Sequence, residues 1–315
     1  MGVKNHVFGS NAERDAWKKL QRRWGDKYSL YPNLPFLMVF DTKNLVDISA
    51  WPHVAPITIT EQDFGRLKKT SIDFILCDDT DKPLVCIEFD GMQDGFNVGT
   101  KYRAADPTDP WRDTIMSLKL KVAHGSRLPY FVVGTREFKD ISASVQMCLV
   151  DALIGSVLAG RTIQERAQHF DPEEIGMTRE EFERLSLPDQ DELIQVWFTG
   201  VEVEADVTLN PVFKAKYDLW KSLCRRLGTV QHRTLYVHQP SIDEAETPTR
   251  RASLLHKAIL HGVRCTVTTE QFGEVTRTIW LPNFNVPGYS AYGFLDEMAE
   301  LVTLDAVRRL ADASL

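Results

Sequence analysis

The stretches Ser71-Ile-Asp-Phe-Ile-Leu-Cys-Asp78 and Pro83-Leu-Val-Cys-Ile-Glu-Phe-Asp-Gly91 decide the fold of this chain. Each is a short apolar run bounded by turn residues, which is typical of a buried β-strand. The link between them is short and polar, so the two runs are predicted to pair as an antiparallel hairpin. Three carboxylates lie within these runs: Asp73, Glu88 and Asp90. A carboxylate in a buried strand is costly unless a partner compensates its charge.

Strand alternation predicts that the three carboxylates converge. Successive side chains of a strand point to opposite faces, so Glu88 and Asp90 share one face. In an antiparallel hairpin, Asp73 near the start of the first strand lies beside Glu88 near the end of the second. Two interpretations fit this arrangement. Either the carboxylates bind a divalent cation, or Asp73 and Asp90 are hydrated strand ends while Glu88 pairs with an arginine or a lysine.

The order of elements around the hairpin resembles a known family. Residues 87–91 read Ile-Glu-Phe-Asp-Gly, and an N-terminal helix that contains Glu13 precedes the hairpin. A basic helix over 109–125 and an apolar strand over 128–134 follow it. Together with Asp73, this order is similar to that of the PD-(D/E)XK nuclease superfamily, in the branch with an E-x-D-G strand end that includes very-short-patch-repair-like domains.

The resemblance covers about residues 8–138. It implies an α/β (α+β) fold with a restriction-endonuclease-like central mixed sheet flanked by helices, to which the rest of the chain adds a C-terminal α+β region. It also implies a site in which carboxylates hold Mg²⁺ or Mn²⁺ as the cofactor. The metal ligands expected on this basis are Asp73, Glu88 and Asp90.

The resemblance further implies a catalytic cation. The superfamily has a lysine two residues after the strand glutamate, and Asp90 occupies that position here. In relatives with this pattern the following helix supplies the basic residue instead, which points to Lys119 or Lys121. Glu13 has a second explanation, because it stands three residues after Ser10 and would complete a helix capping box. The candidate catalytic residues are therefore Glu13, Asp73, Glu88, Asp90, Lys119 and Lys121.

The net charge of −7 argues against a protein that binds nucleic acid through bulk electrostatics. A local basic surface beside an acidic site remains compatible with it. Phosphate contacts from such a surface would be sensitive to salt, and the alternative for each basic residue is a hydrated surface side chain. The candidate nucleic-acid contacts are Lys68, Lys69, Lys101, Arg103 and Arg112.

Composition indicates an ordinary globular protein. The chain has 315 residues, 43% of them hydrophobic, enough for one large core or two modest ones. No apolar run approaches the length of a membrane span and no signal peptide opens the chain, so no membrane association is expected. The five cysteines are odd in number and lack paired spacing, which predicts reduced thiols and a cytoplasmic location.

Turn and linker signals divide the chain into three regions. They are a nuclease-like domain over residues 1–140, a mainly helical region over 141–230 and an α+β region over 231–315 with the order helix, hairpin, helix. Alternation predicts a strand over 201–209. The Asn-Pro pair at 210–211 and Gly228 predict the two ends of a helix.

The function expected from these features is that of a metal-dependent nuclease that hydrolyses phosphodiester bonds of nucleic acid, with DNA rather than RNA as the expected substrate, in restriction, repair or defence. The alternative is a catalytically degenerate nuclease fold that serves as a binding or assembly subunit of a nucleic-acid-processing complex. The expected partner is nucleic acid, with a homodimer or a partner protein contacted through residues 150–315.

Overall fold

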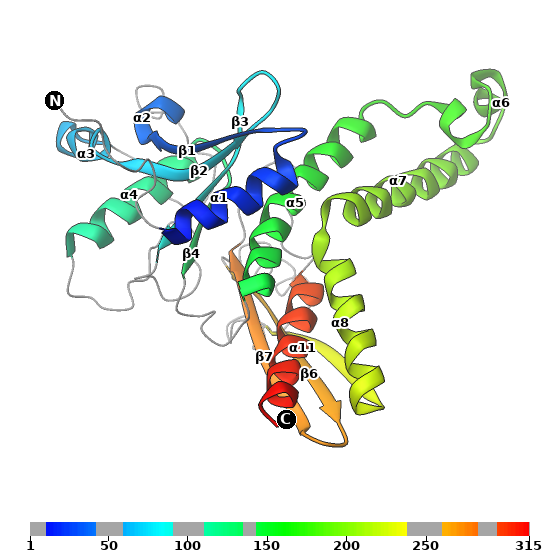
Figure 1. The fold of residues 1–315 in the computed structure, drawn as a ribbon. Coiled ribbons are helices and arrows are strands. Elements are labelled where there is room, and N and C mark those ends of the chain that lie inside the picture. Colours follow the sequence, from blue (N-terminus) through cyan, green and yellow to red (C-terminus); the bar gives the residue numbers. More distant parts are fainter. Residues whose placement is uncertain are drawn as a thin grey trace, which may run out of the picture.

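The predicted hairpin forms the centre of a four-stranded sheet. The structure, a computed structural model, describes residues 11–41, 59–90, 110–134, 143–237, 260–282 and 295–314. In spatial order, the strands are β1 (Ser29–Pro35), β2 (Ser71–Cys77), β3 (Pro83–Asp90) and β4 (Tyr130–Gly134) (Figure 1). β2 pairs antiparallel with both β1 and β3, whereas β4 is parallel to β3. The expected α+β fold with a central mixed sheet flanked by helices is confirmed.

The β2–β3 hairpin has the predicted antiparallel geometry. Phe74 lies opposite Ile87. The turn closes on Asp78, whose Oδ1 accepts hydrogen bonds from the Thr80 hydroxyl and from the backbone N–H groups of Thr80 and Lys82. These bonds satisfy backbone donors that the turn leaves without a strand partner, and they stabilise the tight connection.

Helices cover both faces of the four-stranded sheet (Figure 1). One face packs on α1 (Asn11–Trp24) and α5 (Ala143–Ala167), and the other on α2 (Phe36–Val39), α3 (Glu61–Leu67) and α4 (Pro110–Gly125). Alternation along β3 produces the two layers, because Val85 and Ile87 are buried in the first and Cys86 in the second. Since both faces are covered, a charged side chain in this strand needs a partner within the protein.

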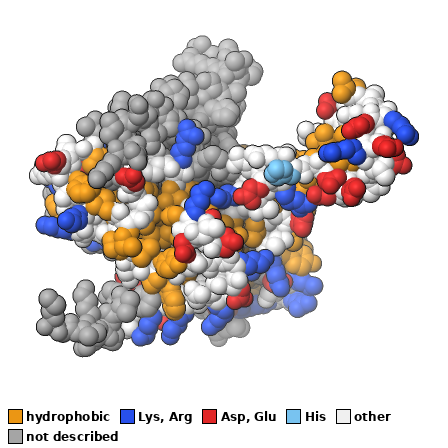
Figure 2. All heavy atoms as spheres, turned by 90° about the horizontal axis from the view of Figure 1, so that it is seen from above, with side chains coloured by type: hydrophobic (Ala, Val, Ile, Leu, Met, Phe, Trp, Pro, Cys, Tyr) orange, Lys and Arg blue, Asp and Glu red, His pale blue; other side chains and the backbone are white. Residues whose placement is uncertain are grey.

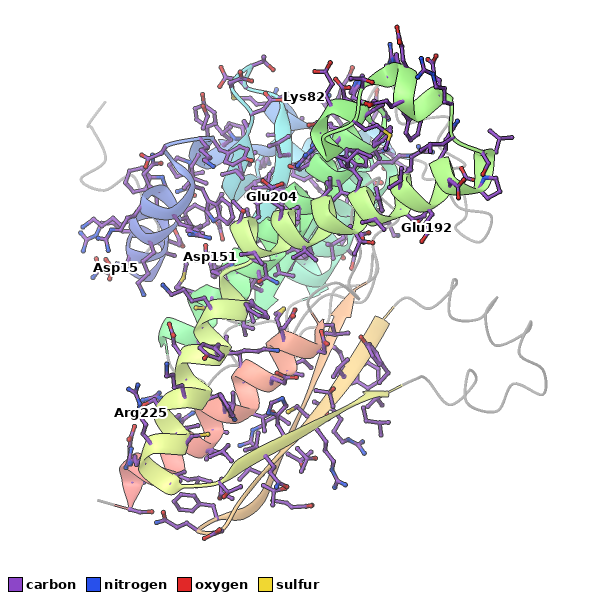
Figure 3. All side chains as sticks on the ribbon, turned by 90° about the vertical axis from the view of Figure 1, so that its right-hand side faces the viewer. Asp15, Lys82, Asp151, Glu192, Glu204 and Arg225 are labelled. Carbon is purple, nitrogen blue, oxygen red and sulfur yellow. The ribbon has the colours of Figure 1, made fainter. Side chains whose placement is uncertain are left out.

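A hydrogen bond joins α1 to α5 on the first face. α1 buries Ala16, Leu20 and Trp24, whose four-residue spacing places them on one side of a helix. The indole N–H of Trp24 donates to Oδ1 of Asp151 at 2.9 Å. Burial raises the pKa of Asp151 to about 6. Asp151 (Figure 3) is therefore a half-buried acid with a raised pKa, on a helix that covers the side of the sheet opposite to α4.

The structure contains a second, three-stranded sheet. It consists of β5 (Val230–Val237), β6 (Leu260–Thr269) and β7 (Gly273–Pro282), all antiparallel, with α8 (Pro211–Leu227) and α11 (Leu295–Ala313) on one face (Figure 3). The β6–β7 hairpin and the helices α8 and α11 were predicted from the sequence, and β5 was not. The segment between β5 and β6, where the first helix of the predicted order would lie, is outside the described residues.

One apolar cluster runs through both sheets. It contains Ile87 of β3, Leu153 of α5, Val263 of β6 and Leu301 of α11. α5 therefore contributes to the core of both parts of the molecule. The proposed boundaries at residues 140 and 230 stay predictions.

A helical arm projects from the body of the molecule (Figures 1 and 2). It contains η2 (Pro172–Ile175), α6 (Arg179–Glu183) and the first half of α7 (Leu187–Leu209). Its tip is held by the rings of Phe170, Phe182 and Trp197, whose centroids lie 5.0 to 5.2 Å apart across Phe170. Arg166 of α5 donates to Glu174 at 2.7 Å. A small aromatic cluster and a surface ion pair therefore fix the arm.

The prediction of a strand over 201–209 is wrong, because these residues complete α7. The segment places apolar residues at both a two-residue and a four-residue spacing. The structure uses the second: Val201, Ala205 and Leu209 are buried, while Val203 and Val207 are exposed. The period of a helix face therefore overrides strand alternation.

The prediction that no apolar run approaches membrane-span length is also wrong. Residues Met147–Ala167 of α5 are long and apolar enough, by length and composition alone, to cross a membrane. Half of their most apolar 18-residue stretch is buried within the protein. The helix packs against α7, α8 and the first sheet. A helix covered on several sides is apolar around most of its circumference, which accounts for its composition.

Gly155→Ala is expected to destabilise the protein by about 2 kcal/mol or more. A Cβ at Gly155 of α5 would lie 2.2 Å from the backbone oxygen of Leu209, where α7 ends. Relieving that contact requires the α5–α7 junction to move apart. Urea denaturation of the two proteins measures the loss.

Gly200→Ala is the matched control, because Gly200 lies in α7 and a Cβ there meets nothing within 4 Å. The higher helix propensity of alanine should stabilise this variant by up to about 1 kcal/mol. Equal stability of the two variants would contradict the close approach at Gly155.

Candidate active site

Four elements bring polar side chains together on the sheet face that α4 covers. Asp73 comes from β2, Glu88 from β3, Lys119 from α4 and Tyr130 from β4. Phe74 pairs with Ile87, and continuing this register by one residue places Asp73 beside Glu88. The predicted approach of these two carboxylates is thus present in the hairpin.

Glu88 and Lys119 form a buried ion pair. Nζ of Lys119 lies 2.8 Å from Oε1 of Glu88, and the two side chains are 5% and 12% exposed, respectively. The ammonium also donates to the backbone oxygen of Ser71 at 2.6 Å. Lys119 is directed inward because its neighbours Met116 and Leu120 are buried on the same side of α4. Such a pair offsets the desolvation of both charges only when its hydrogen bonds are well formed, as they are here.

Tyr130 holds the second oxygen of Glu88. Its hydroxyl donates to Oε2 at 2.5 Å, and the side chain is fully buried. Burial, reinforced by the charge of Glu88, raises the pKa of Tyr130 well above its usual value. The phenol therefore stays neutral and donates, and Glu88 is fixed by one donor on each oxygen.

Asp73 is a largely desolvated carboxyl group beside a second carboxylate, Glu88. Its Oδ2 accepts a hydrogen bond from the backbone N–H of Phe89 at 2.8 Å. Burial and then the charge of Glu88 raise the pKa of Asp73 to about 7, with a smaller contribution from Glu13. The Phe89 N–H and Lys119 act in the opposite direction but do not balance these effects. Without an added cation, Asp73 is therefore only partly ionised at neutral pH.

The two lysines proposed as the catalytic cation differ in their surroundings. Lys119 reaches Glu88, whereas Lys121, two residues along α4, is exposed. Glu13 of α1 lies close enough to Asp73 to affect its pKa. Asp90 ends β3, and its side chain is outside the described part of the protein.

The predicted nucleic-acid contacts are described only in part. Lys68 and Lys69 are exposed between α3 and β2, just before Ser71, and Arg112 is half-buried in the first turn of α4. Lys101 and Arg103 lie outside the described residues. The role of these residues in binding nucleic acid stays a prediction.

Tyr130 is the residue that the sequence analysis missed. The sequence feature that could have indicated it is a tyrosine within the apolar run 128–134. A buried tyrosine hydroxyl normally has a hydrogen-bond partner, and the nearby acidic strand could have supplied one.

A divalent cation fits this site by its donor chemistry. Asp73 and Glu88 present carboxylate oxygens of the kind that Mg²⁺ and Mn²⁺ prefer. Among the described residues, no group of three or more His, Cys, Asp or Glu side chains is arranged to hold a metal. A complete ligand set therefore needs more than the described side chains, such as Asp90, water or substrate oxygens.

No protein-family model, curated protein or solved structure matches this chain. The chemistry of the site is therefore inferred from its own geometry.

Asp73→Asn is expected to stabilise the protein at alkaline pH when divalent cations are absent. The carboxyl group ionises near pH 3.8 when unperturbed and near 7 in the native state, so its cost to stability grows between these pH values and is constant above them. Asparagine removes this cost, which is at most about 4 kcal/mol at pH 8. The difference should vanish below about pH 4. Denaturation in EDTA at several pH values measures it.

Asp63→Asn provides a control of opposite sign. Asp63 completes the capping box of α3 with the N-cap residue Thr60, and hydrogen bonding by the Thr60 hydroxyl lowers the pKa of Asp63. Its stabilising effect is present at neutral pH and is lost as the pH falls through its lowered pKa. Parallel pH profiles for the two variants would contradict the assigned environments.

Lys119→Met is expected to destabilise the protein by about 3–5 kcal/mol, because it leaves the buried carboxylate of Glu88 without its cation. Adding Glu88→Gln should recover most of the loss. Urea denaturation of the two single variants and the double variant gives the coupling energy. Lys121→Met, on the exposed side of the same helix, should change stability by less than about 0.5 kcal/mol. Additive effects at 88 and 119 would show that the ion pair does not form.

Proposed function

We propose that this protein is a metal-dependent nuclease that hydrolyses phosphodiester bonds of nucleic acid, with DNA rather than RNA as its expected substrate. The observation that supports this most directly is the grouping of the half-buried Asp73 with the buried Glu88 and Lys119, which come from three different elements. The order of α1, the β2–β3 hairpin, α4 and β4 agrees with the resemblance to the PD-(D/E)XK superfamily.

In this proposal, Asp73 and Glu88 hold Mg²⁺ or Mn²⁺, with Asp90 as a further candidate ligand. When bound, the cation lowers the pKa of a water molecule and neutralises charge on the scissile phosphate. The Phe89 N–H orients Asp73, and Tyr130 orients Glu88. A bound cation would offset the cost of ionising Asp73, which burial and the neighbouring Glu88 carboxylate impose, so cation binding would release a proton and strengthen as the pH rises.

Lys119 supplies the fixed positive charge of the site. An ammonium group has three N–H donors, and two of them reach Glu88 and Ser71. The third is left to bind a water molecule or a phosphate oxygen. Charge that develops on the phosphate during hydrolysis would be stabilised by this preorganised donor. In this proposal, Lys119 of α4 takes the role of the strand lysine that Asp90 replaces.

A second candidate function is nucleic-acid binding without cleavage. The closed arrangement of Glu88 favours it, since both carboxylate oxygens already accept from protein donors. In that case the ion pair has a structural role, and the protein would act as a binding or assembly subunit.

The nuclease assay uses the purified full chain with Mg²⁺ or Mn²⁺ and with plasmid DNA, single-stranded DNA and RNA. Asp73→Asn, Glu88→Gln and Lys119→Met should each reduce cleavage by about 100-fold or more. Asp151→Asn is the matched control, because it also alters a half-buried acid with a raised pKa but lies on the other side of the sheet. It should leave cleavage unchanged. Cleavage that survives in all three site variants would refute the assignment.

Mn²⁺ titration distinguishes the two functions. An intact metal site should raise the unfolding temperature of the wild type but not that of Asp73→Asn. Nucleic-acid binding without cleavage and without stabilisation by Mn²⁺ would favour the binding subunit.

A further inference from the structure

Three aromatic side chains form a stripe along one side of α8, which lies beside α11 on the second sheet (Figure 3). Phe213, Tyr217 and Trp220, here called the aromatic stripe, follow one another at spacings of four and three residues, so they share one helix face. All three line a hollow of about 200 Å³ where α8 meets β5 and α11. The ring centroids of Tyr217 and Trp220 lie 6.1 Å apart. The three rings therefore border one space.

Polar contacts hold the aromatic stripe in place. The indole N–H of Trp220 donates to the backbone oxygen of Val230 at 3.1 Å. Lys216 lines the same hollow, and its ammonium group lies 2.7 Å from Oε2 of the buried Glu300 and 5.6 Å from the centre of the Phe213 ring. Groups that are already ordered lose little conformational entropy when a ligand binds.

The apolar core does not account for the whole stripe. α8 buries Val212 and Leu223, and Trp220 packs partly against the same cluster. Phe213 and Tyr217 extend beyond it and are 49% and 50% exposed. Exposed apolar side chains that gather in one patch beside charged residues are typical of an interaction surface.

α8 is strongly basic, although the protein as a whole has a net charge of −7. Lys214, Lys221 and Arg225 are exposed, and their spacings of seven and four residues place them in a row beside the aromatic stripe. We call these three residues the cation row; Arg225 lies toward the C-terminal end of the helix (Figure 3). The ammonium group of Lys221 lies 5.8 Å from the centre of the Tyr217 ring. The row and the stripe are therefore in contact.

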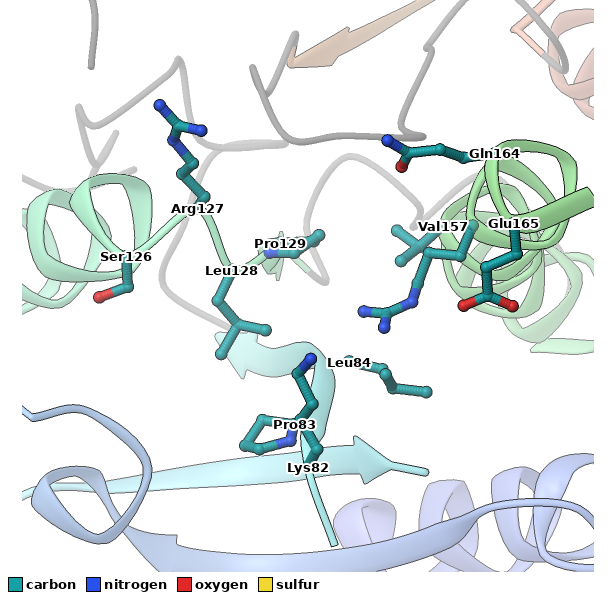
Figure 4. Close-up of a pocket in the computed structure, with 11 residues that line it drawn as sticks. Lys82, Pro83, Leu84, Ser126, Arg127, Leu128, Pro129, Val157, Gln164 and Glu165 are labelled. Atoms are coloured by element: carbon teal, nitrogen blue, oxygen red, sulfur yellow. The ribbon is translucent and has the colours of Figure 1, made fainter. Parts of the chain in front are cut away.

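A larger recess of about 330 Å³ near the β2–β3 turn lacks such convergence (Figure 4). Lys82, Arg127 and Arg161 line it, but the side chain of Arg127 points away from Lys82 and out of the recess. The φ of Arg127, 54°, is that of a residue just after a helix end. The cations of that recess do not surround a common point, in contrast to the side chains along α8.

The features of α8 select a ligand that joins planar rings to anionic groups. Nucleobases stack on aromatic side chains, while neighbouring lysine and arginine side chains contact the phosphates. From Phe213 to Trp220 the stripe rises by roughly 10 Å along the helix axis, the length of about three stacked nucleotides. A cationic ligand is disfavoured, because two lysine ammonium groups already lie against rings of the stripe. An acidic peptide would satisfy the cations but not the rings.

We propose that the aromatic stripe binds unpaired nucleotides of a nucleic-acid strand. The bases stack on its three rings, and the phosphates contact the cation row. Neither set shares a residue with the group around Glu88, so this is a second site. The proposal concerns binding alone, and it goes beyond the proposed nuclease activity because it does not require cleavage.

Binding is measured by fluorescence anisotropy of the full chain in EDTA, which prevents metal-dependent cleavage. The probes are a labelled oligothymidylate, an oligouridylate and an abasic strand of equal charge, each of about twelve nucleotides. The wild type should bind a strand with bases at least about fivefold more tightly than the abasic strand, because only the bases stack. The two strands with bases compare DNA with RNA, and tighter binding of either one than of the abasic strand supports the proposal.

Tyr217→Ala should weaken oligothymidylate binding at least about fivefold and leave binding of the abasic strand unchanged. Tyr217→Trp should retain binding, since it keeps an aromatic face. Leu235→Ala is the matched control and should bind normally. Leu235 is also exposed, but strand alternation places it on the opposite face of β5 from His232, which lines the hollow. Thermal unfolding should show that all three variants keep the fold.

The double variant Lys221→Gln/Arg225→Gln tests the phosphate contacts. It should weaken binding of the strands with and without bases alike, and it should reduce the slope of log affinity against log salt concentration by about 1.4. Asp73→Asn/Glu88→Gln should bind oligothymidylate normally, so a failure of the nuclease assay leaves this test intact.

Several results would overturn the proposal. They are equal binding of the abasic strand and oligothymidylate by the wild type, unchanged binding in Tyr217→Ala, and loss of binding in Asp73→Asn/Glu88→Gln. Tighter binding of a duplex or of polyglutamate than of oligothymidylate would also contradict it. A dimer that Tyr217→Ala dissociates, measured by analytical ultracentrifugation, would identify a second copy of this chain as the occupant instead.

Discussion

A carboxylate buried in a β-sheet needs a donor for each oxygen, and Glu88 obtains both donors from elements that follow it in the chain. Lys119 reaches Oε1 from α4, and Tyr130 reaches Oε2 from β4. This requirement fixes the rotation of α4 on the sheet. It also fixes the pairing of β4, because Tyr130 must face the same layer as Glu88, which it does opposite Cys86 in the parallel register.

α5 has the corresponding role in the apolar core. It contacts β3 on one side and α7, α8 and α11 on the others, so one helix serves both sheets. Its close approach to the end of α7 depends on the missing side chain of Gly155. The same helix has the composition of a membrane span, which illustrates that burial on several sides and burial in lipid select similar residues.

The hairpin could be predicted because strand alternation and a short polar turn indicate the same structure. The sequence could not predict whether Lys119 or Lys121 contacts the acidic site, because both lie on the same helix. Only the packing of α4 determines which of the two faces inward. The prediction of a strand over residues 201–209 was wrong because the apolar residues there fit both a strand period and a helix period. Burial against α5 selects the helical one. Tyr130 was missed because hydrogen bonds between strands from distant parts of the sequence leave no local pattern.

The parallel pairing of β3 and β4 has a consequence for the order of folding. β1, β2 and β3 can associate before the rest of the sheet, whereas β4 joins only after the long connection that contains α4. Long-range pairing of this kind is slow because loop closure precedes any gain in contacts. Until α4 and β4 dock, the Glu88 carboxylate lacks both of its hydrogen-bond donors and stays hydrated. The hairpin backbone can therefore form early, while the interior around Glu88 is among the last parts of the protein from which water is excluded.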